Sequence, residues 1–187
     1  LDLLPPKVGA VIDGVDATEE DVESQYAATT LSASWFGFSD LQTGIHHYEV
    51  SVGTVEDPSL VVDSVNVGLE TTASFYSLPL VDGLTYSFTV TAVDGAGHRA
   101  SNSSNGVLVD FSPPVVADSG TPVDYDVDAP PLDTSYRASD EDTRLVASWE
   151  FEDEQSGIAS YEWRCCPVLE GTVPCAQDWT AVGETTR

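Results

Sequence analysis

The sequence has no Met, few basic residues and few Cys, and these scarcities limit what the protein can be. Among its 187 residues are 6 Lys and Arg and 3 Cys. No apolar run approaches the roughly 18 residues that a membrane-spanning helix needs. Residues 1–6 also lack the basic region and cleavage site typical of a signal peptide. We therefore expect no direct insertion of this chain into a membrane.

The scarcity of Lys and Arg leaves the chain strongly acidic. It has 32 Asp and Glu against 6 Lys and Arg, a formal net charge of −26. The acid is spread along the chain, with 15 acids against 2 bases in residues 5–112 and 16 against 4 in residues 113–187. Such a polyanion repels phosphate backbones, so we expect no nucleic-acid partner. The carboxylates serve solubility or bind a divalent cation, and both interpretations stay open.

The three Cys residues, Cys165, Cys166 and Cys175, all lie in the last quarter of the chain. Their spacing is not that of a zinc site, and no His follows within ligand range. Disulfide bonds are the better interpretation, and they indicate an oxidising compartment. We therefore expect an extracellular or cell-surface location, with one Cys paired outside this chain.

Three blocks of sequence occur twice in the same order, and they predict the domain plan. The offset between copies stays between 108 and 115 residues, so insertions fall between blocks, as expected of loops. The first block matches 1–8 with 109–116, and the third matches 67–72 with 182–186. The second has two segments, 31–35 with 145–149 and then 43–49 with 156–162.

The repeat runs from one Pro-Pro pair to the next, and it predicts one complete module at residues 5–112. Residues 1–4 match the end of a module, so a preceding module is expected. Residues 113–187 match only the first part of a module and carry an acidic insertion at residues 120–142. We expect the chain to be a slice of a longer array. Its partners would be neighbouring modules of the same chain and other copies in an assembly.

Apolar side chains alternate with polar ones at a period of two, not at the helical period of 3.6. Leu31, Ala33 and Trp35 alternate with Ser32 and Ser34, for example. Each such run is bounded by Gly, Pro, Asp or Ser, which is typical of an antiparallel β-sandwich. The pattern predicts an all-β fold with these aromatic core residues: Trp35, Tyr48, Tyr86, Phe88, Trp149, Tyr161 and Trp163.

This layout resembles the fibronectin type III superfamily. The strand around Trp35 is similar to its B strand, and residues 80–97 are similar to its E–F corner and F strand. Tyr86 stands in the place of the family's tyrosine corner, and Val107–Asp110 resembles its strand G. The resemblance implies tandem antiparallel sandwiches of this topology, with the second module incomplete. It says little about function, because the fold hosts many roles.

Alignment of the two copies leaves the disulfide pairing open. It places Cys165 on Val52, so Cys165 should face the core and Cys166 should face outward. Cys166 then pairs with Cys175, and Cys165 pairs in a strand outside this chain. The alternative is a bond between Cys165 and Cys175.

Five aspartates near the expected module junction are candidates for a calcium site, and no other cofactor is expected. Residues 124–128 resemble the opening of an EF-hand loop, but Ala129 stands where Gly is needed and Ser135 where Glu is needed. An EF-hand is therefore excluded, and a looser site stays a hypothesis. Its candidate ligands are Asp110, Asp118, Asp124, Asp126 and Asp128.

Other motifs carry less chemistry, and none predicts an enzyme. Residues 95–100 match a dinucleotide-binding pattern, but no helix follows, so a tight turn is expected. His46 and His47 are adjacent in a strand and should face opposite sides. Asn102 begins a glycosylation sequon on a predicted loop or strand edge.

The repeat, the acid, the sequon and the Pro-Pro linkers together predict a structural module of an extracellular filament, stalk or cell-surface array. Short Pro-Pro linkers limit bending between modules, which suits such an assembly. The alternative is an adhesin or receptor segment that binds a protein or glycan ligand through its loops. The turn expected at residues 94–100 would be the first candidate for that contact.

Overall fold

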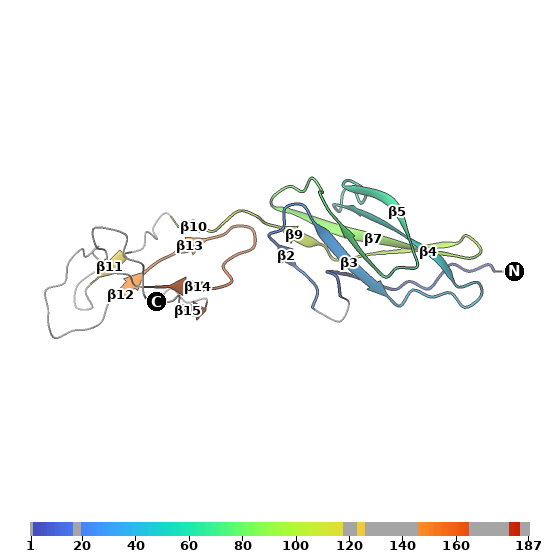
Figure 1. Cartoon of the computed structure of the whole chain (residues 1–187), viewed down its shortest axis with the longest axis horizontal. Coiled ribbons are helices and arrows are strands. Elements are labelled where there is room, and N and C mark those ends of the chain that lie inside the picture. Colours follow the sequence, from blue (N-terminus) through green and yellow to red (C-terminus); the bar gives the residue numbers. More distant parts are fainter. Residues whose placement is uncertain (1, 17–19, 118–122, 126–145, 165–179, 184–187) are drawn as a thin grey trace. The chain divides into compact units, whose positions relative to one another are not determined.

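The chain is all-β and divides into two compact units, residues 1–112 and residues 113–187. Among the described residues, no helix has the length and apolar character needed to cross a bilayer. The computed structural model in Figure 1 describes residues 2–16, 20–117, 123–125, 146–164 and 180–183.

One layer of unit 1 is an antiparallel sheet of three strands in the order β1-β3-β6. Val11 of the first strand pairs with Trp35 of the second. Period-two alternation directs Leu31, Ala33 and Trp35 to the inner face, where each is at most 1% exposed. The strands are β1 (Ala10–Asp13), β3 (Leu31–Phe36) and β6 (Thr72–Phe75).

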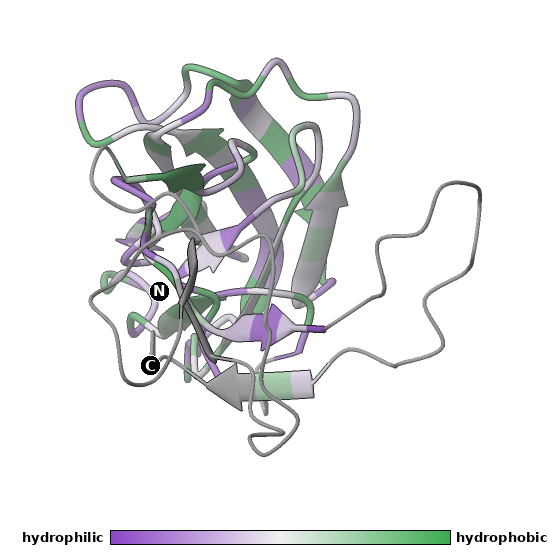
Figure 2. Ribbon diagram, turned by 90° about the vertical axis from the view of Figure 1, so that its left-hand side faces the viewer, coloured by the Kyte–Doolittle hydropathy of each residue, from purple (hydrophilic) through white to green (hydrophobic). Residues whose placement is uncertain are grey.

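The second layer has six strands in the order β2-β9-β7-β4-β5, with β8 also paired to β7. Its central strand, β7, has 11 residues and alternates between buried and half-buried positions from Tyr86 to Ala92. The colour bands along the strands in Figure 2 follow this alternation of hydropathy. The strands are β2 (Ser24–Gln25), β4 (Ile45–Gly53), β5 (Val62–Gly68), β7 (Leu84–Asp94), β8 (Arg99–Ser103) and β9 (Val107–Val109).

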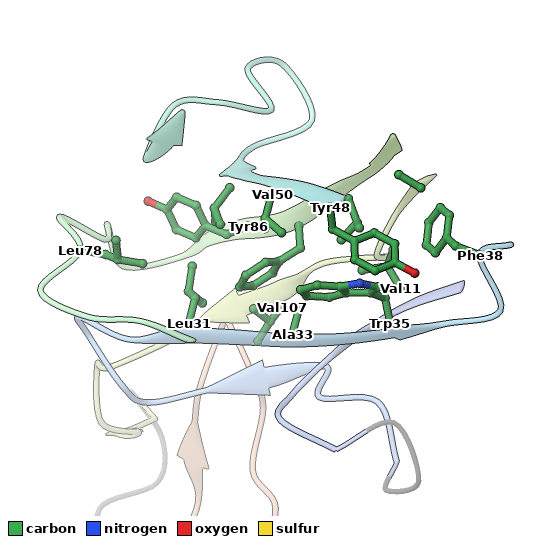
Figure 3. Close-up of a cluster of buried hydrophobic side chains, with 14 of the residues drawn as sticks. Val11, Leu31, Ala33, Trp35, Phe38, Tyr48, Val50, Leu78, Tyr86 and Val107 are labelled. Carbon is green, nitrogen blue, oxygen red and sulfur yellow. The ribbon is translucent and has the colours of Figure 1, made fainter. Parts of the chain in front are cut away.

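The core of unit 1 lies between these two layers, as Figure 3 shows. The ring centroids of Trp35 and Tyr48 are 5.7 Å apart, and those of Phe38 and Tyr48 are 5.8 Å apart. Both pairs meet edge to face, the arrangement that aromatic quadrupoles favour. Of the expected core residues, Trp35, Tyr48, Tyr86 and Phe88 are each at most 7% exposed.

The first strand of unit 1 changes sheets partway along. Its initial part, β1, pairs antiparallel with β3, whereas β2 pairs parallel with β9. The Leu108 N–H donates to the Glu23 carbonyl and the Asp110 N–H to the Gln25 carbonyl, each at 2.9 Å. The sequence does not predict this switch, because residues 14–23 are polar and carry no apolar period. Residues 23–25 consequently lie along the edge beside β9.

Unit 2 repeats the first strand pair of unit 1 at the same register. Asp124 of β11 lies opposite Ala147 of β12, as Asp13 lies opposite Ala33. The short pair of β10 with β13 likewise corresponds to the isolated bridge between Lys7 and Ser39 near the start of unit 1. The strands are β10 (Val115–Val116), β11 (Val123–Tyr125), β12 (Val146–Ser148), β13 (Phe151–Glu152), β14 (Tyr161–Trp163) and β15 (Thr180–Gly183).

A second pair, β14 with β15, repeats the pairing of β4 with β5. Tyr161 lies opposite Gly183, as Tyr48 lies opposite Gly68. In both pairs the register shifts directly after the tyrosine. The repeated sequence blocks therefore fold into repeated backbone geometry, down to the position of a β-bulge.

The aromatic residues of unit 2 are less buried than expected. The rings of Trp149 and Tyr161 are half-buried, with centroids 6.3 Å apart. Trp163, however, is 37% exposed, and its expected place in the core is wrong. Among the described residues β14 pairs with β15 alone, and a two-stranded ribbon buries little surface by itself.

Candidate functional site

Asp40 organises the loop between β3 and β4. Its Oδ1 accepts the N–H groups of Gln42, Thr43 and Gly44 at 2.9, 2.7 and 3.0 Å. These bonds, the one from Thr43 first, hold the pKa of Asp40 below its usual value. The Gly44 carbonyl accepts the N–H of Gly95 at 3.2 Å, which ties this loop to the turn after β7.

Asp94 organises the turn between β7 and β8 in the same way. Its buried carboxylate accepts the N–H groups of Ala96 and His98, each at 2.8 Å, and contacts the His98 Nδ1 at 2.9 Å. Burial raises the pKa of Asp94, but the bonds from His98 and Ala96 outweigh it and keep the pKa below the usual value. The tight turn expected here is confirmed. The turn is followed by β8 and not by the helix start that a dinucleotide-binding pattern requires.

Asp2 completes a polar cluster with these two loops. The Thr43 hydroxyl donates to Asp2 Oδ2 at 2.7 Å, and the Leu4 N–H donates to Asp2 Oδ1 at 3.1 Å. One ligand atom each from Asp2, Asp94 and His98 lies within 4.8 Å of the others, close enough for a single metal ion. All three groups already have protein partners, so the cluster is explained as a scaffold for the loops and the incoming chain.

Asp13 joins the two sheets across the open side of unit 1. Its carboxylate accepts the Ser104 hydroxyl at 2.8 Å and the Gly106 N–H at 2.9 Å, and the residue is 1% exposed. Burial raises the pKa of Asp13 to about 6, although the bonds from Ser104 and Gly106 act the other way. The negative charges of Asp21 and Glu23 raise it further. This carboxylate is structural, because its oxygens point into the fold.

A cavity of about 250 Å³ opens beside Asp13. Its lining includes Asp16, Glu20 and Gln25 together with the apolar Val22. Ligand pockets for drug-sized molecules are commonly larger, about 300–1,000 Å³. The cavity is therefore too small and too acidic to be the main feature of a small-molecule site.

Glu49 gathers donor groups on the outer face of β4. Arg99 donates two hydrogen bonds to it, one of them at 3.1 Å, and the Ser64 hydroxyl donates a third at 2.8 Å. The His47 Nε2 lies 3.2 Å from the same carboxylate. Arg99 first, and then Ser64, lower the pKa of Glu49 to about 2. The carboxylate therefore stays ionised and paired throughout the physiological range.

The two adjacent histidines converge, which corrects the expectation that they face opposite sides. The Nδ1 atoms of His46 and His47 are 2.8 Å apart. The register between β4 and β7 shifts between Ile45 and His47, and this irregularity breaks the strict alternation of side chains.

The candidate calcium ligands fall mostly outside the described residues. Asp118, Asp126 and Asp128 lie outside them, and Asp124 is described by its backbone alone, in β11. Asp110 is 7% exposed and accepts the N–H and hydroxyl of Ser112 at 3.2 and 3.1 Å. The three candidate disulfide residues, Cys165, Cys166 and Cys175, also lie outside the described part of the chain.

The candidate glycosylation residue, Asn102, lies in the edge strand β8 with an exposed side chain. Its Nδ2 donates to the Gly9 carbonyl at 2.9 Å and so helps to close the side of the sandwich. The hydroxyl of the third sequon residue, Ser104, donates to Asp13 and accepts the Phe88 N–H at 3.0 Å. Both sequon side chains therefore have structural roles in the folded unit.

A pair of equivalent aspartates was not predicted from the sequence: Asp40 in unit 1 and Asp153 in unit 2, each of which holds a loop by hydrogen bonds to its backbone. Asp153 repeats the role of Asp40, since its Oδ1 accepts the N–H groups of Gln155, Ser156 and Gly157 at 3.0, 2.9 and 3.2 Å. The signal was available, because each aspartate stands four residues before a repeated Gly. That Gly has a φ of 70° in unit 1 and 74° in unit 2, a conformation that favours glycine.

No model of a known protein family matches the chain, and no curated protein is significantly similar to it.

Proposed function

We propose that this chain is part of a tandem array of fibronectin type III-like modules with a structural role in an extracellular filament, stalk or cell-surface coat. The observation that carries the proposal is the recurrence of geometry in the two units. The Asp40 and Asp153 loops share three hydrogen bonds each, and the pairs of β1 with β3 and of β11 with β12 share a register. Such recurrence is what modules built to be joined in series require.

The strand order of unit 1 supports the fibronectin type III-like part of the proposal. A sheet of β1, β3 and β6 faces a sheet in which β7 lies beside β4, and β4 beside β5. The Tyr86 hydroxyl accepts the N–H of Val81 at 3.0 Å, which is the contact that a tyrosine corner makes. The parallel pairing of β2 with β9 departs from an all-antiparallel sandwich.

The segments before Pro5-Pro6 and Pro113-Pro114 support the array. Asp2 accepts the N–H of Leu4 at 3.1 Å, and Asp110 accepts the N–H of Ser112 at 3.2 Å. Each aspartate thus forms the same short turn two residues ahead, directly before the prolines. A turn followed by two prolines makes a stiff connector, which suits fixed spacing between modules.

A second candidate, an adhesin or receptor segment, is favoured by one observation. Leu41 is 100% exposed at the tip of the loop that Asp40 organises. An apolar side chain presented on a rigid loop is the kind of residue that anchors a protein contact. The proposal gives the chain no catalytic activity under either candidate.

Electron microscopy of the native assembly tests the structural role. The expected result is a polymer or extended stalk whose axial repeat corresponds to one or two modules. Discrete particles with a bound ligand, and no periodic assembly, would instead favour the receptor segment. In that case Leu41→Ser should weaken ligand binding, whereas the matched exposed substitution Leu69→Ser, on the loop after β5, should not.

A further inference from the structure

The outward face of β4, β7 and β8 carries a regular array of hydroxyl groups, which we call the hydroxyl face. The strand registers place its side chains in two rows across the sheet. One row joins Ser51 to Thr89 and Ser103, and the other joins Glu49 to Thr91 and Ser101. The hydroxyl face is defined by Ser51, Thr89, Thr91, Ser101 and Ser103.

Four of the five hydroxyls of the hydroxyl face hydrogen-bond to one another in pairs. The hydroxyls of Thr89 and Ser103 are 2.8 Å apart, and so are those of Thr91 and Ser101. Burying a polar group costs most when it loses its hydrogen bonds to water without replacement. Since four of its five hydroxyls already have a partner, the face loses little on dehydration and is suited to contact with another surface.

The face is also neutral, on a unit that is otherwise strongly acidic. Residues 1–112 contain 16 Asp and Glu but only two bases, Lys7 and Arg99. One of these two bases, Arg99, reaches from β8 across β7 to the carboxylate of Glu49, the acid within the rows of this face. Arg99, one of only two basic residues in the unit, thus neutralises the charge of Glu49 on this face.

We propose that the hydroxyl face is the surface through which a second copy of this chain docks, face to face. The charge distribution selects this occupant. Two copies that each carry a net charge of −26 repel one another, and they can touch at low cost only where neither presents an unpaired carboxylate. A basic partner would be drawn to the acidic segment at residues 13–23, not to a neutral face.

A face-to-face contact uses the same patch on both copies, which closes a symmetric pair. This contact deepens the proposed structural role and rests on it for its biological meaning. One contact per module is weak, but modules joined in series present it repeatedly, and linked weak contacts reinforce one another. Lateral association of stalks or filaments would follow.

The salt dependence of self-association tests the charge argument. Amide spectra of the 187-residue chain are recorded by NMR from about 20 μM to about 1 mM, the range suited to a weak dimer. Concentration-dependent shifts should be confined to β4, β7 and β8. Raising NaCl from about 0.02 to about 0.5 M should strengthen the association at least about threefold, because salt screens the repulsion between copies. If opposite charges held the two copies together, the added salt would weaken the association instead.

A charge cycle at Glu49 and Arg99 tests the face itself. Arg99→Gln leaves the negative charge of Glu49 without its cationic partner and should weaken self-association at least about fivefold at low salt. The double variant Glu49→Gln with Arg99→Gln makes the face neutral again and should return within about twofold of the unmodified chain. A merely structural role of the ion pair would not produce this recovery.

A matched pair of substitutions locates the contact. Ser101→Glu adds a charge to the hydroxyl face, whereas Ser74→Glu adds one to the outer face of the other sheet. Both serines are exposed and each belongs to a cross-strand hydroxyl pair of 2.8 Å. Ser101→Glu should abolish the concentration-dependent shifts and Ser74→Glu should keep them.

A chain that stays monomeric at about 1 mM and high salt would overturn the inference. The reverse ranking of the two Glu variants would also overturn it, since the contact would then involve the other sheet. Neither outcome touches the proposed structural role, which depends on imaging of the native assembly and not on this face.

Discussion

The carboxylate of Asp13 and the hydroxyl of Ser104 form a 2.8 Å hydrogen bond between residues 91 positions apart in sequence. Ser104 also accepts the N–H of Phe88, so a single hydroxyl connects β1 of one sheet to β7 of the other. The bond closes the side of the sandwich at which the first strand changes sheets. It also holds an ionisable group that is 1% exposed, and this makes the stability of the unit depend on pH.

The substitution Asp13→Asn should stabilise unit 1 at neutral pH. Burial raises the pKa of Asp13 from 3.8 to about 6, so the folded state favours the protonated form. That contribution to stability is fully present below the unfolded-state pKa of 3.8 and is lost as pH rises through about 6. A shift of this size corresponds to at most about 3 kcal/mol. Thermal unfolding from pH 4 to pH 7 measures it.

The comparison is made as the difference in melting temperature between the variant and the unmodified chain at each pH. This difference should be small near pH 4 and should grow in favour of the variant toward pH 7. A difference that does not change with pH would contradict the prediction, because it would mean that Asp13 does not titrate in this window.

The substitution Tyr86→Phe should destabilise unit 1 by about 1–2 kcal/mol, because it leaves the N–H of Val81 without its partner. Urea unfolding monitored by tryptophan fluorescence measures the change. Tyr76→Phe is the control, since Tyr76 is 71% exposed, and it should leave the midpoint unchanged. Equal effects of the two variants would argue that the hydroxyl of Tyr86 has no special role.

The substitution Asp40→Ala should loosen its loop without unfolding the unit. The N–H groups of Gln42, Thr43 and Gly44 lose their shared acceptor, so their hydrogen exchange should speed up at least about tenfold. Since the pKa of Asp40 is lowered, these bonds are fully present above the usual Asp pKa and weaken as pH falls through the lowered value.

Asp153→Ala is the matched variant in unit 2, and it should act on the amides of residues 155–157 alone. Hydrogen exchange read by mass spectrometry on peptides from each loop distinguishes the two. Protection that persists in both variants would show that the backbone holds these loops without the aspartates.

Glycosylation of Asn102 should occur before folding or not at all. In the folded unit the Asn102 amide donates to Gly9 and the Ser104 hydroxyl donates to Asp13, so the sequon is engaged at both ends. Intact mass after secretion from a eukaryotic host measures occupancy during synthesis. Treatment of the folded, unmodified chain with an oligosaccharyltransferase should add little glycan. Efficient addition to the folded chain would contradict the structural role of these two side chains.

Many strands of unit 1 could be predicted because a strand produces a period-two alternation among neighbouring residues. The alternation of Leu31, Ala33 and Trp35 with serines is a property of neighbouring residues, and so is the turn at Asp94. The convergence of His46 and His47 could not be predicted, because it depends on a register shift between two strands. Such shifts arise from pairing over long sequence distances.

In unit 2 the sequence repeat corresponds to repeated strand pairing but does not give the burial of side chains. The matched blocks adopt the same strand pairing in the structure, β4 with β5 in unit 1 and β14 with β15 in unit 2. The period-two alternation of unit 2 predicted a buried Trp163, and that prediction was wrong, since Trp163 is 37% exposed. Burial depends on which strands pack over a residue, and a repeated block carries no information about strands outside it.

The all-β class and the recurrence of blocks along the chain follow from the sequence without any structure, because both are local patterns. Which polar side chains contact one another was decided only by the tertiary structure. Asp13 and Ser104, or Glu49 and Arg99, meet only when strands 50 to 91 residues apart become neighbours. Their separation in sequence gives no sign of contact, since the pairing of whole sheets brings them together and then sets their pKa values.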